Sequence, residues 1–170
     1  MNSHRIVLAR SSLLGFAALI AAGALALPTL PALAYSENST KAVNIDTAGL
    51  AIRGYDPVAY FTVGKPTLGS PQFTAQHDGA TYRFASAANR DVFAKEPAKY
   101  APAFGGFCAM GAVFEKKLDG DPNLWRIVDG KLYLNVGEPA LKRWLEDVPG
   151  NIGKAQTNWT NIKDKAPKDL

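Results

Sequence analysis

The fold is decided by the stretch FTAQHDGATYRF at residues 73–84. On each side of Asp78-Gly79, apolar residues alternate with polar ones, which is the period of a half-buried β-strand. An Asp-Gly pair readily adopts the two positive φ angles of a type I′ turn, which joins antiparallel strands well. The stretch therefore predicts a β-hairpin. Directly after it, Ser86 is a favourable N-cap, and the composition of residues 87–95 predicts a helix.

The same plan recurs further along the chain. Residues 124–135 predict a second hairpin around Asp129-Gly130, and apolar residues at helical spacing predict a helix from about Pro139. We therefore predict an α+β fold, with one small domain of two β-hairpin-plus-helix units. Its strands are antiparallel, and the helices pack on them.

Aligning the two Asp-Gly turns relates the units to each other. Tyr82 then falls on Tyr133 and Phe93 falls on Trp144, and both pairs are 51 residues apart. Aromatic residues at matching places in a strand and in the following helix are typical of core positions. We interpret the two units as an internal repeat.

Three further segments complete the predicted domain. Residues 51–61 are rich in β-branched and aromatic residues and predict a strand, interrupted at Gly54 and at Asp56-Pro57. Residues 105–120 join the two units. Residues 150–162 predict a short helix that covers the outside of the core.

The first 34 residues have the pattern of an export signal. Arg5 and Arg10 form a positive start, residues 13–27 are apolar, and Ala32-Leu33-Ala34 is a small-x-small cleavage site. We expect cleavage near Ala34-Tyr35, a periplasmic or secreted mature protein, and no stable membrane insertion after cleavage. The expected boundaries are a signal peptide at 1–34, a flexible lead-in at 35–50, the domain at 51–160 and a polar tail at 161–170.

The charge and cysteine content narrow the classes of function. The chain has a net charge of +4, and removing Arg5 and Arg10 leaves 4 − 2 = +2. Aromatic residues do not interleave with Lys/Arg clusters, so the sequence gives no support for nucleic-acid binding. A single cysteine in an oxidising compartment forms no internal disulfide, so the core must be stabilised by burial.

Two motifs carry a resemblance to a known family. They are GYDPVAYF at residues 54–61 and YRFASAANRDVFAKEPAKY at residues 82–100. Together they resemble the YHS domain family, whose metal-binding members have cysteines within these patterns. Here the corresponding positions hold Ala59, Ala85 and Asn89, none of which supplies a thiolate. The resemblance covers nearly the whole mature domain. It implies a small α+β module that works with a metal-handling protein partner, but it transfers no metal ligands.

The candidate site is therefore built on the only cysteine, Cys108, in GGFCAMG at residues 105–111. If this stretch is extended, Cys108 and Met110 point to the same face. A thiolate and a thioether are soft ligands that select Cu(I), and His77 is a candidate third ligand. On a helix the two sulfur residues would lie about 200° apart, and this arrangement would fail.

Two other interpretations of Cys108 stay open. Free cysteine is often a buried small hydrophobe, and the chain would then be a non-metal structural or protein-interaction module. Alternatively, Cys108 acts in a thiol redox protein or sensor. The sequence has no Cys-x-x-Cys and no Gly-x-Ser-x-Gly, so we predict no enzyme. Asp56, which precedes a proline, is expected to accept backbone N–H groups in a turn. The sequence carries no signal for oligomeric state.

Overall fold

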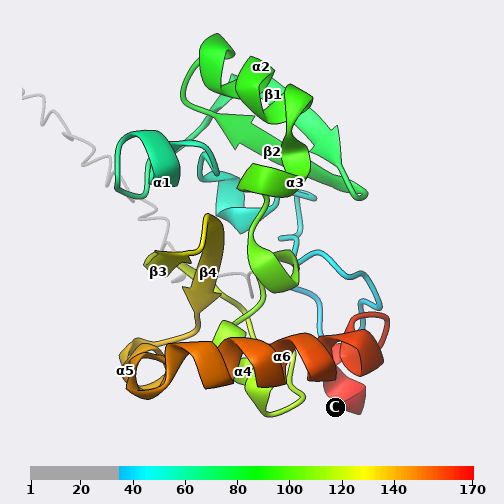
Figure 1. Cartoon of the computed structure of the whole chain (residues 1–170). Helices are drawn as coiled ribbons and strands as arrows, with labels where there is room; N and C mark the ends of the chain where they lie inside the picture. Colours follow the sequence, from blue (N-terminus) through cyan, green and yellow to red (C-terminus); the bar gives the residue numbers. More distant parts are fainter. Residues whose placement is uncertain (1–34) are drawn as a thin grey trace, which may run out of the picture. The chain divides into compact units, whose positions relative to one another are not determined.

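Two α+β units follow each other along the chain (Figure 1). The computed structural model describes residues 35–170, and the predicted signal peptide lies outside them. The first unit consists of η1 (Ile52–Gly54), α1 (Ala59–Thr62), β1 (Ser70–His77), β2 (Ala80–Phe84), α2 (Ala87–Lys95) and α3 (Pro97–Tyr100). The second consists of η2 (Ala103–Gly106), α4 (Ala109–Val113), β3 (Asp121–Val128), β4 (Lys131–Asn135), α5 (Glu138–Glu146) and α6 (Val148–Ile162). A 3-10 turn, η3 (Pro167–Asp169), follows. Within residues 35–170, no helix is both long and apolar enough to cross a membrane.

The repeat extends over the whole of each unit. Ser70 begins β1 and Asp121 begins β3, 51 residues later, and the same interval separates the starts of β2 and β4, of α2 and α5, and of α3 and α6. Each hairpin is an antiparallel pair with a register shift early in its first strand. The structure thus confirms the predicted pair of hairpin-plus-helix units.

The aromatic pairs that the alignment matched have nearly the same geometry in both units. The rings of Tyr82 and Phe93 are 4.8 Å apart at 35°, and those of Tyr133 and Trp144 are 5.3 Å apart at 36°. Each pair fixes the helix after a hairpin onto the second strand of that hairpin. The aromatic side chains therefore set the same strand-to-helix packing twice.

Local sequence signals explain the turns and one helix start. Asp78 and Asp129 both have φ of 49°, and the glycine after each also has a positive φ, as predicted for the Asp-Gly turns. Ser86 caps α2, and its side chain accepts the N–H of Asn89 at 3.1 Å. These predictions are confirmed.

Strand β4 lies between two apolar cores. Leu132 and Leu134 pack into the core of the first unit, while Tyr133 packs into the core of the second. Successive side chains of a strand point to opposite faces, so one strand can serve both cores. Because β4 is buried on both faces, the two units share a continuous interior.

The predicted strand at 51–61 is wrong. Ile52 and Arg53 have φ of 51° and 50°, in the left-handed region, so the chain turns as η1 where extension was predicted. After Asp56-Pro57 it turns again into α1. The β-branched and aromatic residues gave a wrong prediction because a short apolar run is compatible with a buried turn as well as with a strand.

The helix predicted at 150–162 is present and begins earlier, since α6 starts at Val148. Its Ile152 and Trp159 pack against the second core, and Asn158 donates from its amide to two carbonyls of α4 at 3.0 and 3.1 Å. Part of the expected lead-in is also packed on the domain, since Val43 is buried there.

A buried carboxylate connects three elements of the first unit. Asp56 is fully buried. Its Oδ1 accepts the N–H groups of Val58 and Ala59, at 2.8 and 3.2 Å, at the start of α1. Its Oδ2 accepts the N–H of Ala85 at 2.9 Å and the side-chain amide of Asn89 at 2.6 Å. The expected turn role of Asp56 is confirmed, and the same carboxylate also binds the end of β2 and the first turn of α2.

A buried ammonium joins the two ends of the described chain. The Nζ of Lys117 donates to the carbonyl oxygens of Lys41, Lys163 and Lys165 at 2.8–2.9 Å, and lies 4.8 Å from the centre of the Phe107 ring. Burial lowers the pKa of Lys117 to about 8, so it still carries three N–H donors at neutral pH. Three donors for three carbonyls satisfy the group without a carboxylate.

We expect Asp56→Asn to lower the free energy of unfolding by about 2–3 kcal/mol in urea titration. An amide cannot accept on both sides, so buried N–H groups such as that of Ala85 lose their acceptor. The matched control is Asp91→Asn, since Asp91 is exposed and pairs only with its neighbour Arg90. That change should stay within about 0.5 kcal/mol of the unchanged protein. Equal effects of the two changes would contradict a central role for Asp56.

Candidate functional site

The segment that carries Cys108 and Met110 is not extended, so that prediction is wrong. Cys108 is the N-cap of α4, and Met110 lies in its first turn. Phe104 and Gly105 have φ of 53° and 60°, which turns the chain just before the helix. A five-residue helix is too short to leave a periodic signal in the sequence. The same-face argument for the two sulfur atoms therefore fails.

Cys108 occupies the place in the second unit that Asp56 has in the first. The backbone N–H of Asp56 donates to the carbonyl of Thr67, and that of Cys108 donates to the carbonyl of Leu118, both at 2.8 Å. Thr67 and Leu118 are 51 residues apart, as the repeat requires. The interval from Asp56 to Cys108 is one residue longer because η2 has four residues and η1 has three.

The backbone around Cys108 presents the same set of donors as the backbone around Asp56. The N–H of Gly111 donates to Sγ at 3.2 Å. The N–H groups of Met110 and Val136 also face the sulfur, as those of the corresponding residues face the Asp56 carboxylate. The Met110 N–H in addition donates to Oδ1 of Asn135 at 3.3 Å. The thiol in turn donates to Oδ1 of the buried Asn135, at 3.7 Å. The second unit therefore uses a thiol where the first uses a carboxylate.

Burial determines the protonation of this thiol. Cys108 is completely buried, and desolvation raises its pKa above the usual value by more than the N–H donors of Gly111, Val136 and Met110 lower it. A thiol with a raised pKa is a poor nucleophile at neutral pH, because the thiolate is the reactive form. Cys108 is therefore poorly reactive as a nucleophile in the folded protein.

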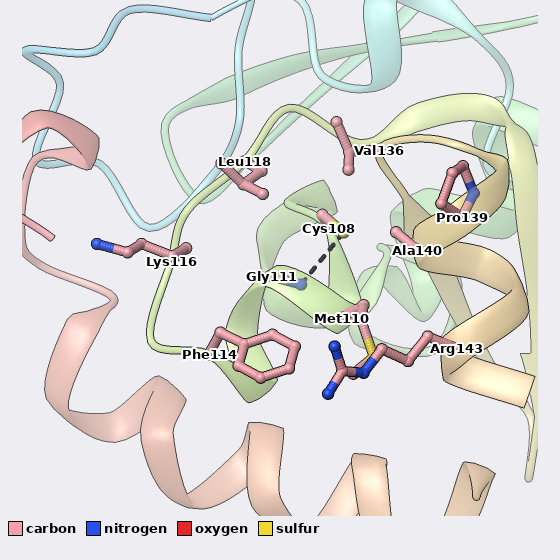
Figure 2. Close-up of a pocket in the computed structure, with 10 residues that line it drawn as sticks. All are labelled: Cys108, Met110, Gly111, Phe114, Lys116, Leu118, Val136, Pro139, Ala140 and Arg143. Carbon is pink, nitrogen blue, oxygen red and sulfur yellow. Dashed lines mark hydrogen bonds between the residues drawn. The ribbon is translucent and has the colours of Figure 1, made fainter. Parts of the chain in front are cut away.

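A pocket of about 370 Å³ opens beside Cys108 (Figure 2). Its walls come from α4, from the loop before β3 and from the start of α5. They are mainly apolar, with two cationic side chains. The lining residues are Cys108, Met110, Gly111, Phe114, Lys116, Leu118, Val136, Pro139, Ala140 and Arg143. Figure 2 shows the Met110 thioether close to Arg143, whereas Cys108 lies on the far wall beside Gly111.

His77 belongs to a different part of the molecule. It ends β1, stacks edge-on against Phe93 at 5.9 Å, and lies 3.3 Å from the carboxylate of Asp78. The pocket that it lines shares no residue with the pocket beside Cys108. The structure brings Cys108 and Met110 to one pocket but does not bring His77 to them.

The positions where the family resemblance places cysteines do come together, around Asp56. Ala59 and Ala85 direct their N–H groups at its carboxylate, and Asn89 directs its amide at it. All of these groups are donors, whereas a metal ion needs acceptors. These residues do not fit a metal. Within residues 35–170, no cluster of three or more His, Cys, Asp or Glu side chains is arranged to hold one.

The sequence prediction missed the side chains that shape the pocket, above all Ala140 and Arg143. A signal for Ala140 was available. The interval of 51 residues that matches Tyr82 with Tyr133 also matches Asn89 with Ala140, so a large polar residue is replaced by a small one at this position. Arg143 had no comparable signal, because a cation near a helix end is typical of many solvated helices.

Comparison with protein families, with curated proteins and with solved structures finds no match to this chain.

We expect the Cys108 thiol to be protected in the folded protein. At pH 8 its reaction with an aromatic disulfide reagent should be on the order of 100-fold slower than in guanidinium chloride, because reaction requires local opening. Absorbance of the released thiolate measures both rates. A folded-state rate within a few-fold of the unfolded rate would contradict the assignment of Cys108 as a buried, protonated thiol.

Proposed function

We propose that this chain is a non-catalytic binding module, and that the pocket beside Cys108 accepts an apolar group of its ligand. The observation that carries the proposal is the pocket itself, with a volume of about 370 Å³ and mainly apolar walls. Ligand sites of small molecules typically have volumes of about 300–1,000 Å³ and walls of this kind. In this proposal Cys108 is an inert part of the wall.

Exposed apolar side chains at the pocket support the proposal. Phe114 is 46% exposed and Val136 is 42% exposed, and Leu118 is also exposed. Three such residues around one cavity form a patch, whereas single exposed apolar residues are ordinary on a protein surface. A ligand in the pocket would remove part of this apolar surface from water.

The resemblance to YHS domains and the export of the protein are parts of this proposal. Two observations support the resemblance: the α+β architecture, and the convergence of Ala59, Ala85 and Asn89 on one point. We infer a module in which a hydrogen-bonded carboxylate, Asp56, has taken the place of a metal centre.

Titration with a neutral apolar compound tests the proposed function. We expect 1-octanol to shift the backbone amide resonances of Gly111, Val136 and Ala140 in a saturable manner, because its chain enters the pocket. Ala140→Leu should remove these shifts by filling the cavity. Ala94→Leu is the matched control, since Ala94 is exposed on α2 and lies outside this pocket. Shifts spread over the whole surface, or unaffected by Ala140→Leu, would refute the proposed site.

Soft-metal binding is a second candidate, and one observation favours it. Cys108 and Met110 are both on the wall of one pocket, so a Cu(I) ion could contact a thiolate and a thioether. The buried, protonated state of Cys108 opposes it, because the metal would have to displace the thiol proton. A thiol redox function has less support, because the raised pKa lowers the reactivity of Cys108.

Anaerobic titration with Cu(I) against a competing chelator separates the candidates. The proposed module predicts no binding above that of Cys108→Ala. Stoichiometric binding that Cys108→Ala abolishes and Met110→Leu weakens would instead establish the metal function. His77→Ala should have no effect in either case, since His77 lies in another pocket.

A further inference from the structure

The two repeats differ at a helix position that lines the pocket. Asn89 is the third residue of α2, and Ala140 is the third residue of α5. In the first unit, Asn89 reaches back to Asp56 and its amide donates to the carboxylate at 2.6 Å, which closes the space between helix and turn. In the second unit, Ala140 ends at its Cβ. The corresponding space over Cys108 stays open as the pocket.

The charged residues that line the pocket are both cations. Lys116 and Arg143 are among the lining residues, and no acidic residue is. Among the described residues, neither side chain is in an ion pair or donates a side-chain hydrogen bond. Glu146 and Asp147 lie beyond Arg143 in a neighbouring depression and form no ion pair with it. An anion at the mouth would therefore meet two cations that are not already paired with a carboxylate.

Arg143 is held at the opening by an aromatic ring. Its guanidinium carbon lies 4.7 Å from the centre of the Phe114 ring, and Figure 2 shows the guanidinium beside this ring at the edge of the pocket. Contact with the ring restricts the guanidinium, while its N–H groups stay free to bind. A restricted guanidinium loses less entropy when it forms two parallel hydrogen bonds to a carboxylate.

We propose that the pocket binds a small amphiphilic anion, a carboxylate with a single alkyl chain or aromatic ring. This inference rests on the proposed function and names the class of ligand for the same site. The apolar part lies against Leu118, Val136 and Ala140, over Cys108. The carboxylate lies at the mouth and binds Arg143, with Lys116 as the second cation. The volume of about 370 Å³ is at the lower end of the range for ligand sites, which favours one short chain.

Three compounds with the same chain test the headgroup: octanoate, 1-octanol and octylammonium. We expect octanoate to bind at least about 10-fold more tightly than 1-octanol, and octylammonium to bind most weakly, as measured from the amide resonances of Gly111, Val136 and Ala140. Added salt should weaken octanoate binding and leave 1-octanol binding unchanged, since salt screens exposed charges.

Substitutions of single cations identify the residue that binds the carboxylate of octanoate. Arg143→Gln should reduce octanoate affinity to that of 1-octanol, and Arg143→Lys should retain part of the difference. Lys154→Gln is the matched control. The Nζ of Lys154 lies 6.0 Å from the centre of the same Phe114 ring, but Lys154 does not line the pocket. It should therefore leave octanoate binding unchanged. Urea unfolding of each variant checks that the fold is retained. The salt series tests the contribution of charge to octanoate binding without any substitution.

The outcomes separate the two proposals. Equal binding of octanoate and 1-octanol at the pocket would overturn the anion proposal and leave the binding module intact. The anion proposal would also be overturned if Lys154→Gln lowered octanoate affinity as much as Arg143→Gln does. If none of the three compounds shifts the pocket amides, both proposals fail.

Discussion

A carboxylate buried in an apolar interior must have all its acceptor sites filled, and this constraint organises the first unit. Asp56 meets it with three backbone N–H groups and the amide of Asn89, which fixes α1, the end of β2 and the start of α2 in one arrangement. The second unit keeps the same backbone donors but places a thiol among them. Cys108 needs fewer partners than a carboxylate, so Ala140 can replace the amide side chain, and a cavity results. The same backbone conformation thus encloses a filled interior in the first unit and an open pocket in the second.

Much of the fold could be predicted from sequence because its signals are local. The two Asp-Gly pairs demand positive φ angles, Ser86 caps a helix, and an interval of 51 residues relates the units. The strand expected at 51–61 failed for a physical reason. An apolar run of that length is compatible with any buried backbone, and the periodicity gives no signal for the left-handed φ angles of Ile52 and Arg53.

The site was predicted less well, because a pocket forms where side chains leave space unfilled, and a small residue such as Ala140 gives no sequence signal of its own. Cys108 and Met110 were singled out for their sulfur atoms, and both do line the pocket, but the role of Cys108 follows from its equivalence to Asp56. That equivalence is off by one residue from the main repeat, so alignment of the hairpins alone conceals it. Arg143 contacts Phe114 from another element, and no local pattern predicts such a contact.

The Lys117 ammonium has a consequence for the topology of the chain. By binding the carbonyls of Lys41, Lys163 and Lys165 at once, it links residues that lie 76, 46 and 48 positions away along the chain, and so brings the two ends of the described chain together. A backbone bond nearby continues this closure, from Lys168 to the carbonyl of Glu37 at 3.1 Å. Closing loops of this length costs on the order of 4 kcal/mol in chain entropy, which these contacts must offset. Because its two ends are adjacent, the described chain is suited to circular permutation. A short linker would join the present ends, and new termini would be opened at a hairpin tip.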